Sequence, residues 1–201
     1  MTSGFRQSGL PPPFASRTRV SLMKRFAAVT LAALSLAVPG AVEGQDYDPE
    51  AKLSEMGITL PVPQGPSRSA FDRTVRTGNL VFTSGHAPCG EWDGSGRGKV
   101  PTEASLEEAQ AAARQVVICI LGSLKAEIGD LSRVTRVVRV FGMVNSAPDF
   151  TAQSQVMNAA SGLLNEVFGD RGRHVRSAVG MAALPVNLTV EIEMVFEVEE
   201  G

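Results

Sequence analysis

The chain has 201 residues, a net charge of −2 and a hydrophobic fraction of 43%. This size and composition fit one ordinary globular domain and exclude a disordered or collagen-like protein. One hydrophobic core is enough for a chain of this length.

Residues 1–44 have the order of a secretory signal peptide. The basic residues at Met23–Arg25 precede an apolar run, Phe26–Val38, and then small residues that end at Gly44. The apolar run is shorter than the roughly 20 residues that span a bilayer, so we expect no stable membrane anchor. Residues 1–22 have no periodicity and precede a second potential start at Met23. An N-terminal anchor that is never cleaved remains the alternative interpretation.

Cleavage after Ala41 or Gly44 would release a secreted or periplasmic protein. Removal of residues 1–44 takes away five basic residues and one acidic residue, so the net charge changes from −2 to −6. A phosphate backbone repels such a domain on average. We therefore expect no nucleic-acid partner.

Residues 45–68 are predicted to be a lead-in to the domain, and its part Ala51–Arg68 is predicted to be extended because its three prolines disfavour a helix. Two strands, Phe71–Thr77 and Leu80–Ser84, then flank a two-residue turn of favourable chemistry. The glycine-rich segment Gly85–Lys99 has no phosphate-binding motif and is predicted to be a surface loop.

A helix is predicted from Ser105, which forms a capping box with Glu108, to a stop at Gly129. A third strand is expected over Val134–Val144. A second helix is expected to open at Pro148 and to end near residue 169.

Two strand-like runs close the chain on either side of Leu184–Asn187. In the first run, alternation places Arg176 over small residues, which leaves room for a ligand. The second run alternates apolar residues with glutamates, beginning at Val190 and Glu191. A guanidinium and a carboxylate are thus expected on neighbouring segments. Alternatively, these charges only face solvent on a half-exposed sheet.

The predicted order is β-β-α-β-α-β-β, an α+β fold with two helices packed on one face of a sheet. The other face would leave apolar side chains partly exposed, so self-association is expected.

The two cysteines that follow the signal segment are predicted to be separate thiols, because Cys89 is on a loop and Cys119 is in an apolar helix. Neither cysteine is in a zinc-like spacing with His86 or His174, so no metal site is expected.

Five groups of residues resemble, in order, the Rid family of YjgF-like proteins, reactive imine deaminases that are also named L-PSP endoribonucleases. The matching segments are Arg76–Gly85, Ser105–Arg114, Gly129–Val134, Val144–Phe150, and Arg173–Val179 with Leu184, Pro185 and Val190–Glu193. The resemblance runs from about Ala51 to Val198 and implies a domain over residues 69–199. It also implies a chorismate-mutase-like fold, a homotrimer whose sheets form a central barrel, and ligand clefts between subunits.

By this resemblance, Arg176 binds the carboxylate of a 2-imino or 2-enamino acid, and Glu191 orients the water that attacks the C=N carbon. The products would be a 2-oxo acid and ammonia. No cofactor is implied, because a protonated imine is already electrophilic.

Four other positions match pocket positions of the family: Phe71, Ser84, Asn158 and Ala178. Phe71 stands where many members have tyrosine, Ala178 where some have cysteine, and His86 where glutamine is usual. These departures concern substrate choice and rate more than the presence of a cleft. Alternatively, Ser84 only ends a strand, Asn158 faces solvent and Phe71 belongs to the core.

Two other functions stay open. The same cleft of a trimer could hold a small carboxylate without turnover, since the usual sources of reactive enamines are cytoplasmic. Endoribonuclease activity rests on the family name alone.

Overall fold

The computed structural model describes residues 47–63, 70–89 and 96–200. The predicted signal peptide, its cleavage sites and the potential start at Met23 lie outside the described residues, as do Gly90 and Gly94 of the glycine-rich loop. The predicted domain boundaries at 44 and 68 therefore stay predictions.

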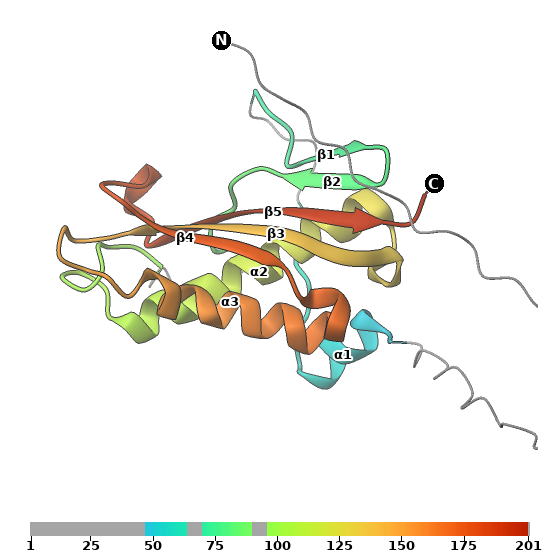
Figure 1. The fold of residues 1–201 in the computed structure, drawn as a ribbon, viewed down its shortest axis with the longest axis horizontal. Coiled ribbons are helices and arrows are strands. Elements are labelled where there is room, and N and C mark those ends of the chain that lie inside the picture. Colours follow the sequence, from blue (N-terminus) through green and yellow to red (C-terminus); the bar gives the residue numbers. More distant parts are fainter. Residues whose placement is uncertain (1–46, 64–69, 90–95, 201) are drawn as a thin grey trace, which may run out of the picture. The chain divides into compact units, whose positions relative to one another are not determined.

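One mixed sheet of five strands forms the centre of the fold (Figure 1). Its spatial order is β1-β2-β5-β3-β4, and all neighbours are antiparallel except β3 and β4. The last strand of the chain therefore lies at the centre of the sheet. The strands span Thr74–Thr77 (β1), Leu80–Thr83 (β2), Val134–Asn145 (β3), Val175–Met181 (β4) and Val190–Val198 (β5).

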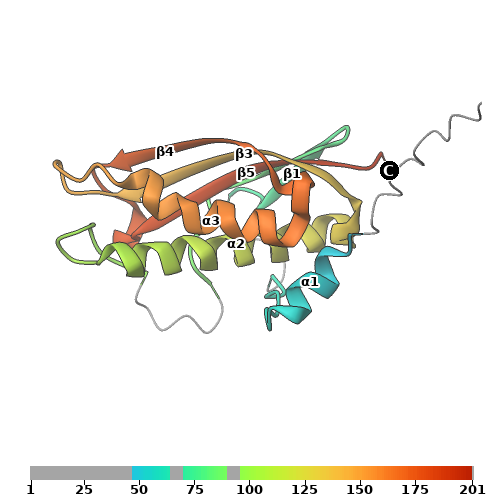
Figure 2. The ribbon, with the colours of Figure 1, turned by 60° about the horizontal axis from the view of Figure 1, so that its bottom comes forward.

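Two long helices, α2 (Leu106–Ile128) and α3 (Gln153–Phe168), lie side by side on one face of this sheet (Figure 2). Both sides of the predicted capping box of α2 are present at Ser105 and Glu108. The second helix begins at Gln153 rather than at Pro148, because the intervening residues form a turn in which Phe150 N–H donates to the Ala147 carbonyl. The predicted α+β fold with two covering helices is confirmed.

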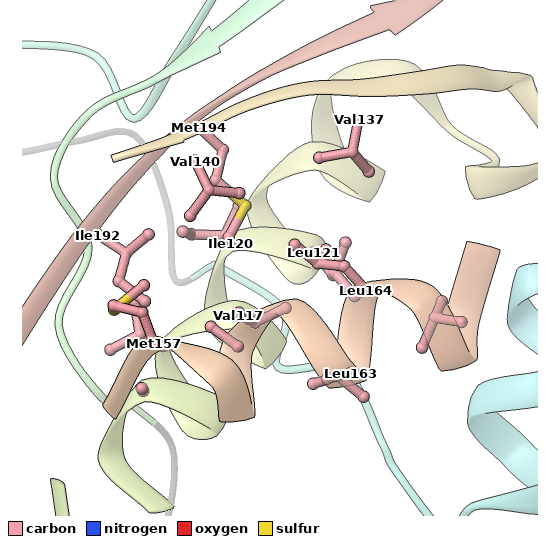
Figure 3. Packing of buried hydrophobic residues seen from close by; sticks show 14 of the residues in the cluster. Val117, Ile120, Leu121, Val137, Val140, Met157, Leu163, Leu164, Ile192 and Met194 are labelled. Carbon is pink, nitrogen blue, oxygen red and sulfur yellow. The ribbon is translucent and has the colours of Figure 1, made fainter. Parts of the chain in front are cut away.

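The core lies between these helices and the sheet (Figure 3). Its fully buried side chains come mainly from α2, α3, β3 and β5. The alternation along β5 is regular because one face of this strand is turned to the core. Examples of the fully buried residues are Ile120, Leu121, Val140, Met157, Leu164, Ile192 and Met194.

A short helix, α1 (Pro49–Glu55), corrects the prediction of an extended segment over Ala51–Arg68. Asp48 caps this helix by accepting hydrogen bonds from two backbone N–H groups, and Pro49 occupies the first turn, where no N–H partner is lost. Leu53 anchors the helix in the core and is only 2% exposed. The prolines farther along the segment do not restrict this earlier turn.

A disulfide joins Cys89 to Cys119, so the prediction of two separate thiols is wrong. The segment after β2 runs back across α2, where Gln115 Nε2 donates a hydrogen bond to the Cys89 carbonyl. This return places the two Cα atoms 6.0 Å apart, within bridging range. Local sequence context placed the cysteines in different elements but did not show that these elements touch.

The sheet face opposite the helices carries exposed apolar side chains. Val75, Phe82 and Val175 are 54%, 42% and 67% exposed. Strand pairing aligns Val75 with Phe82, Phe82 with Val195, and Val195 with Arg139. An apolar strip therefore runs over β1, β2 and β5 on the open face, and Arg139 of β3 separates it from Val175 on β4. In the described ranges no helix is long and apolar enough to cross a membrane.

Candidate functional site

Arg176 lies on the edge strand β4, on the face that the helices cover. It pairs with Val140, whose side chain is fully buried, and paired residues of a sheet share a face. Its guanidinium reaches α3, where Nη1 and Nη2 both donate to Asn158 Oδ1 at 3.1 Å. Nη1 also donates to Ser161 Oγ at 3.0 Å, and Nη2 to the Ser154 carbonyl at 3.3 Å. The predicted pair of Arg176 and Asn158 is therefore brought together.

The Nε–H of Arg176 has no hydrogen-bond partner in the part of the chain that the structure describes. The longest of the four guanidinium contacts, to the Ser154 carbonyl, involves Nη2. Nε and Nη2 together form the fork that binds carboxylates side-on. A carboxylate would thus need to displace only this long contact.

A chain of hydrogen bonds fixes the orientation of the guanidinium. Nδ1 of His174 lies 2.6 Å from the Gly172 carbonyl and must carry the proton there, because a carbonyl only accepts. Nε2 is then free to accept from Ser161 Oγ, 3.0 Å away, whose oxygen accepts from Arg176. Burial lowers the pKa of His174 and the charge of Arg176 lowers it further, against the opposing effect of the hydrogen bond to the Gly172 carbonyl. The net effect favours the neutral ring.

An open cleft of about 880 Å³ lies beside this cluster. Arg173, His174 and Arg176 line the cleft together with Ser161 and Asp170. Two guanidinium groups and one carboxylate give the lining an excess of positive charge, which suits an anionic ligand.

Glu191 lies on β5 and points to the opposite, open face of the sheet. Its neighbours Val190 and Ile192 are fully buried under the helices, and alternation turns Glu191 the other way. Partial burial raises the pKa of Glu191 above its ordinary value, and the negative charge of Glu193 raises it further. A carboxylate of raised pKa is a stronger base near neutral pH.

Within one chain, therefore, Arg176 and Glu191 do not meet. Strand β3 separates β4 from β5, and Arg176 aligns with Val140 whereas Glu191 aligns with Met143, three residues farther along β3. The prediction that guanidinium and carboxylate emerge from neighbouring segments is wrong for the single chain. The two closing strands follow one another in the sequence, but β4 pairs in parallel with β3 and β5 pairs with the other side of β3.

Two of the other predicted residues lie beside these places, Ala178 on the strand of Arg176 and Ser84 next to the Gly85–Glu191 contact. Ala178 follows Arg176 on the same face of β4 and packs against the core. Ser84 directly follows β2 and precedes Gly85, which closely approaches the Glu191 carboxylate. Phe71 precedes β1 and is 59% exposed, so it is not a core residue.

Sequence reasoning missed Ser161, His174 and Gly85. Ser161 follows Asn158 by three residues, so both lie on one helix face, and His174 precedes Arg176 by two residues on one strand face. These two spacings can be recognised in the sequence. The approach of Gly85 to Glu191 cannot be recognised there, because it arises from strand pairing. In the described residues no group of three His, Cys, Asp or Glu side chains converges on a common metal position.

Gly85→Ala is expected to displace the Glu191 carboxylate. An added Cβ would overlap with Oε1 of Glu191, the mobile end of a flexible side chain, so the fold should tolerate the change. Any turnover that needs this carboxylate should fall by about 10-fold, since misplacing a reacting group is costly. Gly162→Ala is the matched control, because a Cβ there meets nothing within 4 Å. Equal rates for both variants would contradict this role of Gly85.

Glu193→Gln is expected to lower the pKa of Glu191, because it removes a negative charge that raises this pKa. If turnover needs ionised Glu191, activity falls as the pH drops through that pKa, and the acidic limb of the pH–rate profile should move to lower pH. Glu197→Gln removes an equal charge from the same face of β5 and should leave the limb in place. A limb that does not move in Glu193→Gln would exclude Glu191 as the titrating group.

Comparison with known proteins supports a common fold and family. Residues 64–198 match the model of the family described as endoribonuclease L-PSP. The chain is 39% identical over 148 residues to Protein TCP17 of Trypanosoma cruzi, a match that covers 73% of this chain and 92% of that protein.

Two solved structures are also similar. A protein of unknown function from Agrobacterium tumefaciens is 38% identical with a TM-score of 0.68, over 75% of this chain and 91% of that one. A proposed endoribonuclease from Shewanella oneidensis is 26% identical with a TM-score of 0.70, over 75% of this chain and 99% of that one.

Proposed function

The chain belongs to the endoribonuclease L-PSP (YjgF/Rid) family, and on this basis we propose that it deaminates reactive 2-imino and 2-enamino acids by hydrolysis. Arg176 of one copy binds the substrate carboxylate, and Glu191 of a second copy activates the attacking water. The active form is a homotrimer with three such clefts. The observation that supports this proposal is that Arg176 and Glu191 lie on opposite faces of one sheet. One copy alone therefore cannot bring the two side chains to the same substrate.

The exposed face gives a reason for assembly. Burying Val75, Phe82 and Val175 against other copies would remove apolar surface from water, and Glu191 lies on that same face. Arg176 sits at the edge strand beside it. A neighbouring copy packed over the open face can therefore bring its own edge to Glu191. Measurement of the mass in solution tests this: a monomer at working concentration would contradict the proposal.

The chemistry needs only protein groups and water. The fork of Nε and Nη2 on Arg176 holds the carboxylate, which orients the imine carbon. Glu191 takes a proton from water while the oxygen bonds to that carbon, giving a carbinolamine. Glu191 then gives the proton to the amino nitrogen. The C–N bond breaks as the carbinolamine hydroxyl loses its proton to Glu191, so that ammonia departs and a 2-oxo acid is left. The raised pKa of Glu191 suits these proton transfers.

The direct test generates imines with an amino-acid oxidase and traps them with semicarbazide. The protein lacking residues 1–44 should accelerate release of 2-oxo acid and reduce the trapped fraction. Arg176→Ala and Glu191→Gln should both abolish this acceleration. Rates equal to those in buffer would refute the deaminase.

A second candidate function is binding of a small carboxylate without turnover. It is favoured by Phe71 and Ala178, which lack the hydroxyl and thiol that the resemblance associates with the pocket. Thermal stabilisation by a 2-oxo acid, without imine hydrolysis, would establish it. Cleavage of RNA at low salt, where electrostatic binding is strongest, would instead support the activity in the family name.

We also propose that residues 1–44 direct export and are then removed. The mass of the protein recovered from outside the cytoplasm tests this proposal. Cleavage after Ala41 or Gly44 would support it, and an intact N-terminus would contradict it.

A further inference from the structure

A second cavity, of about 470 Å³, lies away from the Arg176 cleft and shares no lining residue with it. One wall is apolar and comes from Pro61, Val62 and Pro63. The lining also includes His86 from the segment after β2 and Ser123 from α2. Apolar walls with a few convergent polar groups are typical of small-molecule sites.

His86 and Ser123 form a directed hydrogen-bond chain. Nδ1 of His86 lies 2.9 Å from the Ser84 carbonyl, which can only accept, so Nδ1 carries the proton. Nε2 lies 2.9 Å from Ser123 Oγ and accepts from its hydroxyl. A serine hydroxyl that donates to an imidazole, itself oriented by a third group, is the arrangement of an activated nucleophile.

The environment favours the neutral form of this imidazole, which is the form that can accept a proton. Burial lowers the pKa of His86, and the charge of Arg73 lowers it further, against the opposing effect of the Ser84 carbonyl. Arg73 also lines the cavity. A cation there would favour negative charge that develops on a reacting oxygen.

The disulfide fixes the pair in place. Cys119 precedes Ser123 by one helical turn on the same face of α2, and both Cys89 and Cys119 line the cavity. The covalent link holds the segment of His86 against the helix of Ser123. A covalent support of this kind keeps the reacting side chains at a fixed distance and orientation.

We propose that this cavity is a second, acyl-transfer site at which Ser123 attacks small uncharged carboxylic esters and His86 acts as the base. Ser123 Oγ bonds to the carbonyl carbon while its proton passes to Nε2 of His86. The bond to the alcohol oxygen then breaks, and the alcohol leaves with that proton. Water, deprotonated by His86, attacks the acyl-serine, and the acid departs as Ser123 recovers its proton.

A second serine–histidine pair provides an internal comparison. Ser161 also donates to a histidine, His174, at 3.0 Å. However, the oxygen of Ser161 already accepts a hydrogen bond from the Arg176 guanidinium. That bond occupies one of the two lone pairs of the oxygen, and the cation draws electron density from it, so Ser161 is a poorer nucleophile than Ser123.

The test uses an alkyl fluorophosphonate and 4-nitrophenyl acetate. The wild-type protein should take up one phosphonyl group, which peptide mass spectrometry should place on Ser123. Ser123→Ala should lose both labelling and ester hydrolysis, and His86→Gln, which keeps a hydrogen-bonding side chain, should hydrolyse the ester at least about 100-fold more slowly. Absence of labelling, or labelling of Ser161 instead, would overturn the proposal even if a variant failed to fold.

Discussion

Arg176→Ala is expected to weaken the binding of a 2-oxo acid by about 100-fold. A bidentate, charge-assisted contact contributes roughly 1.5–3 kcal/mol, and each 1.4 kcal/mol is tenfold in affinity. The guanidinium is already held by Asn158 and Ser161, so little further ordering is needed when a ligand binds. Isothermal titration with pyruvate, a stable analogue of the imino acid, measures the effect.

Two further variants separate charge from geometry. Arg173→Ala removes the same charge from an exposed neighbour that lines the same cleft, and should weaken binding much less. Arg176→Lys keeps the charge but loses the planar fork, so it should resemble Arg176→Ala more than wild type. If Arg173→Ala and Arg176→Ala weaken binding equally, the cleft attracts anions only through its overall charge.

The second large effect concerns the disulfide. The bond links residues that are 30 apart in sequence, and closing a loop of that length restricts the unfolded chain. The expected loss of stability on reduction is about 3–4 kcal/mol. Urea denaturation with and without dithiothreitol measures this loss as a shift of the unfolding midpoint.

The double variant Cys89→Ser with Cys119→Ala serves as the control. It should match the reduced wild-type protein in stability and should not respond to dithiothreitol, because neither cysteine remains. Cys119 is only 4% exposed, so alanine, which keeps the helix, suits the buried position. A midpoint that reduction does not change in wild type would show that the bond contributes nothing to folding.

Much of the fold could be predicted because local patterns determine it. The capping box at Ser105, the stop at Gly129 and the alternation along Val190–Val198 each act through neighbouring residues, and each is found where predicted. Helix α1 was missed although Asp48 and Pro49 are a strong helix start. Pro61 and Pro63 lie beyond this helix, so they do not disfavour it.

The arrangement of the site could not be predicted from the same patterns. Alternation shows which residues share a face with Arg176 on β4 and which share a face with Glu191 on β5. It does not show that these are opposite faces of the sheet, because that depends on how both strands pair with β3. The disulfide and the pair of His86 with Ser123 likewise join segments far apart in sequence. The spacing of apolar and polar residues along the chain contains no information on contacts between distant segments.

The central position of β5 affects how the protein folds during its synthesis. β5 pairs with both β2 and β3, so without it the sheet would consist of two separate pairs, β1–β2 and β3–β4. Helix α2 also packs on β5, and the side chains of β5 complete the core. A nascent chain therefore cannot complete this sheet until residues 190–198 have been synthesised. Until then the β1–β2 and β3–β4 pairs remain unjoined, and the apolar side chains that β5 would cover stay in contact with water.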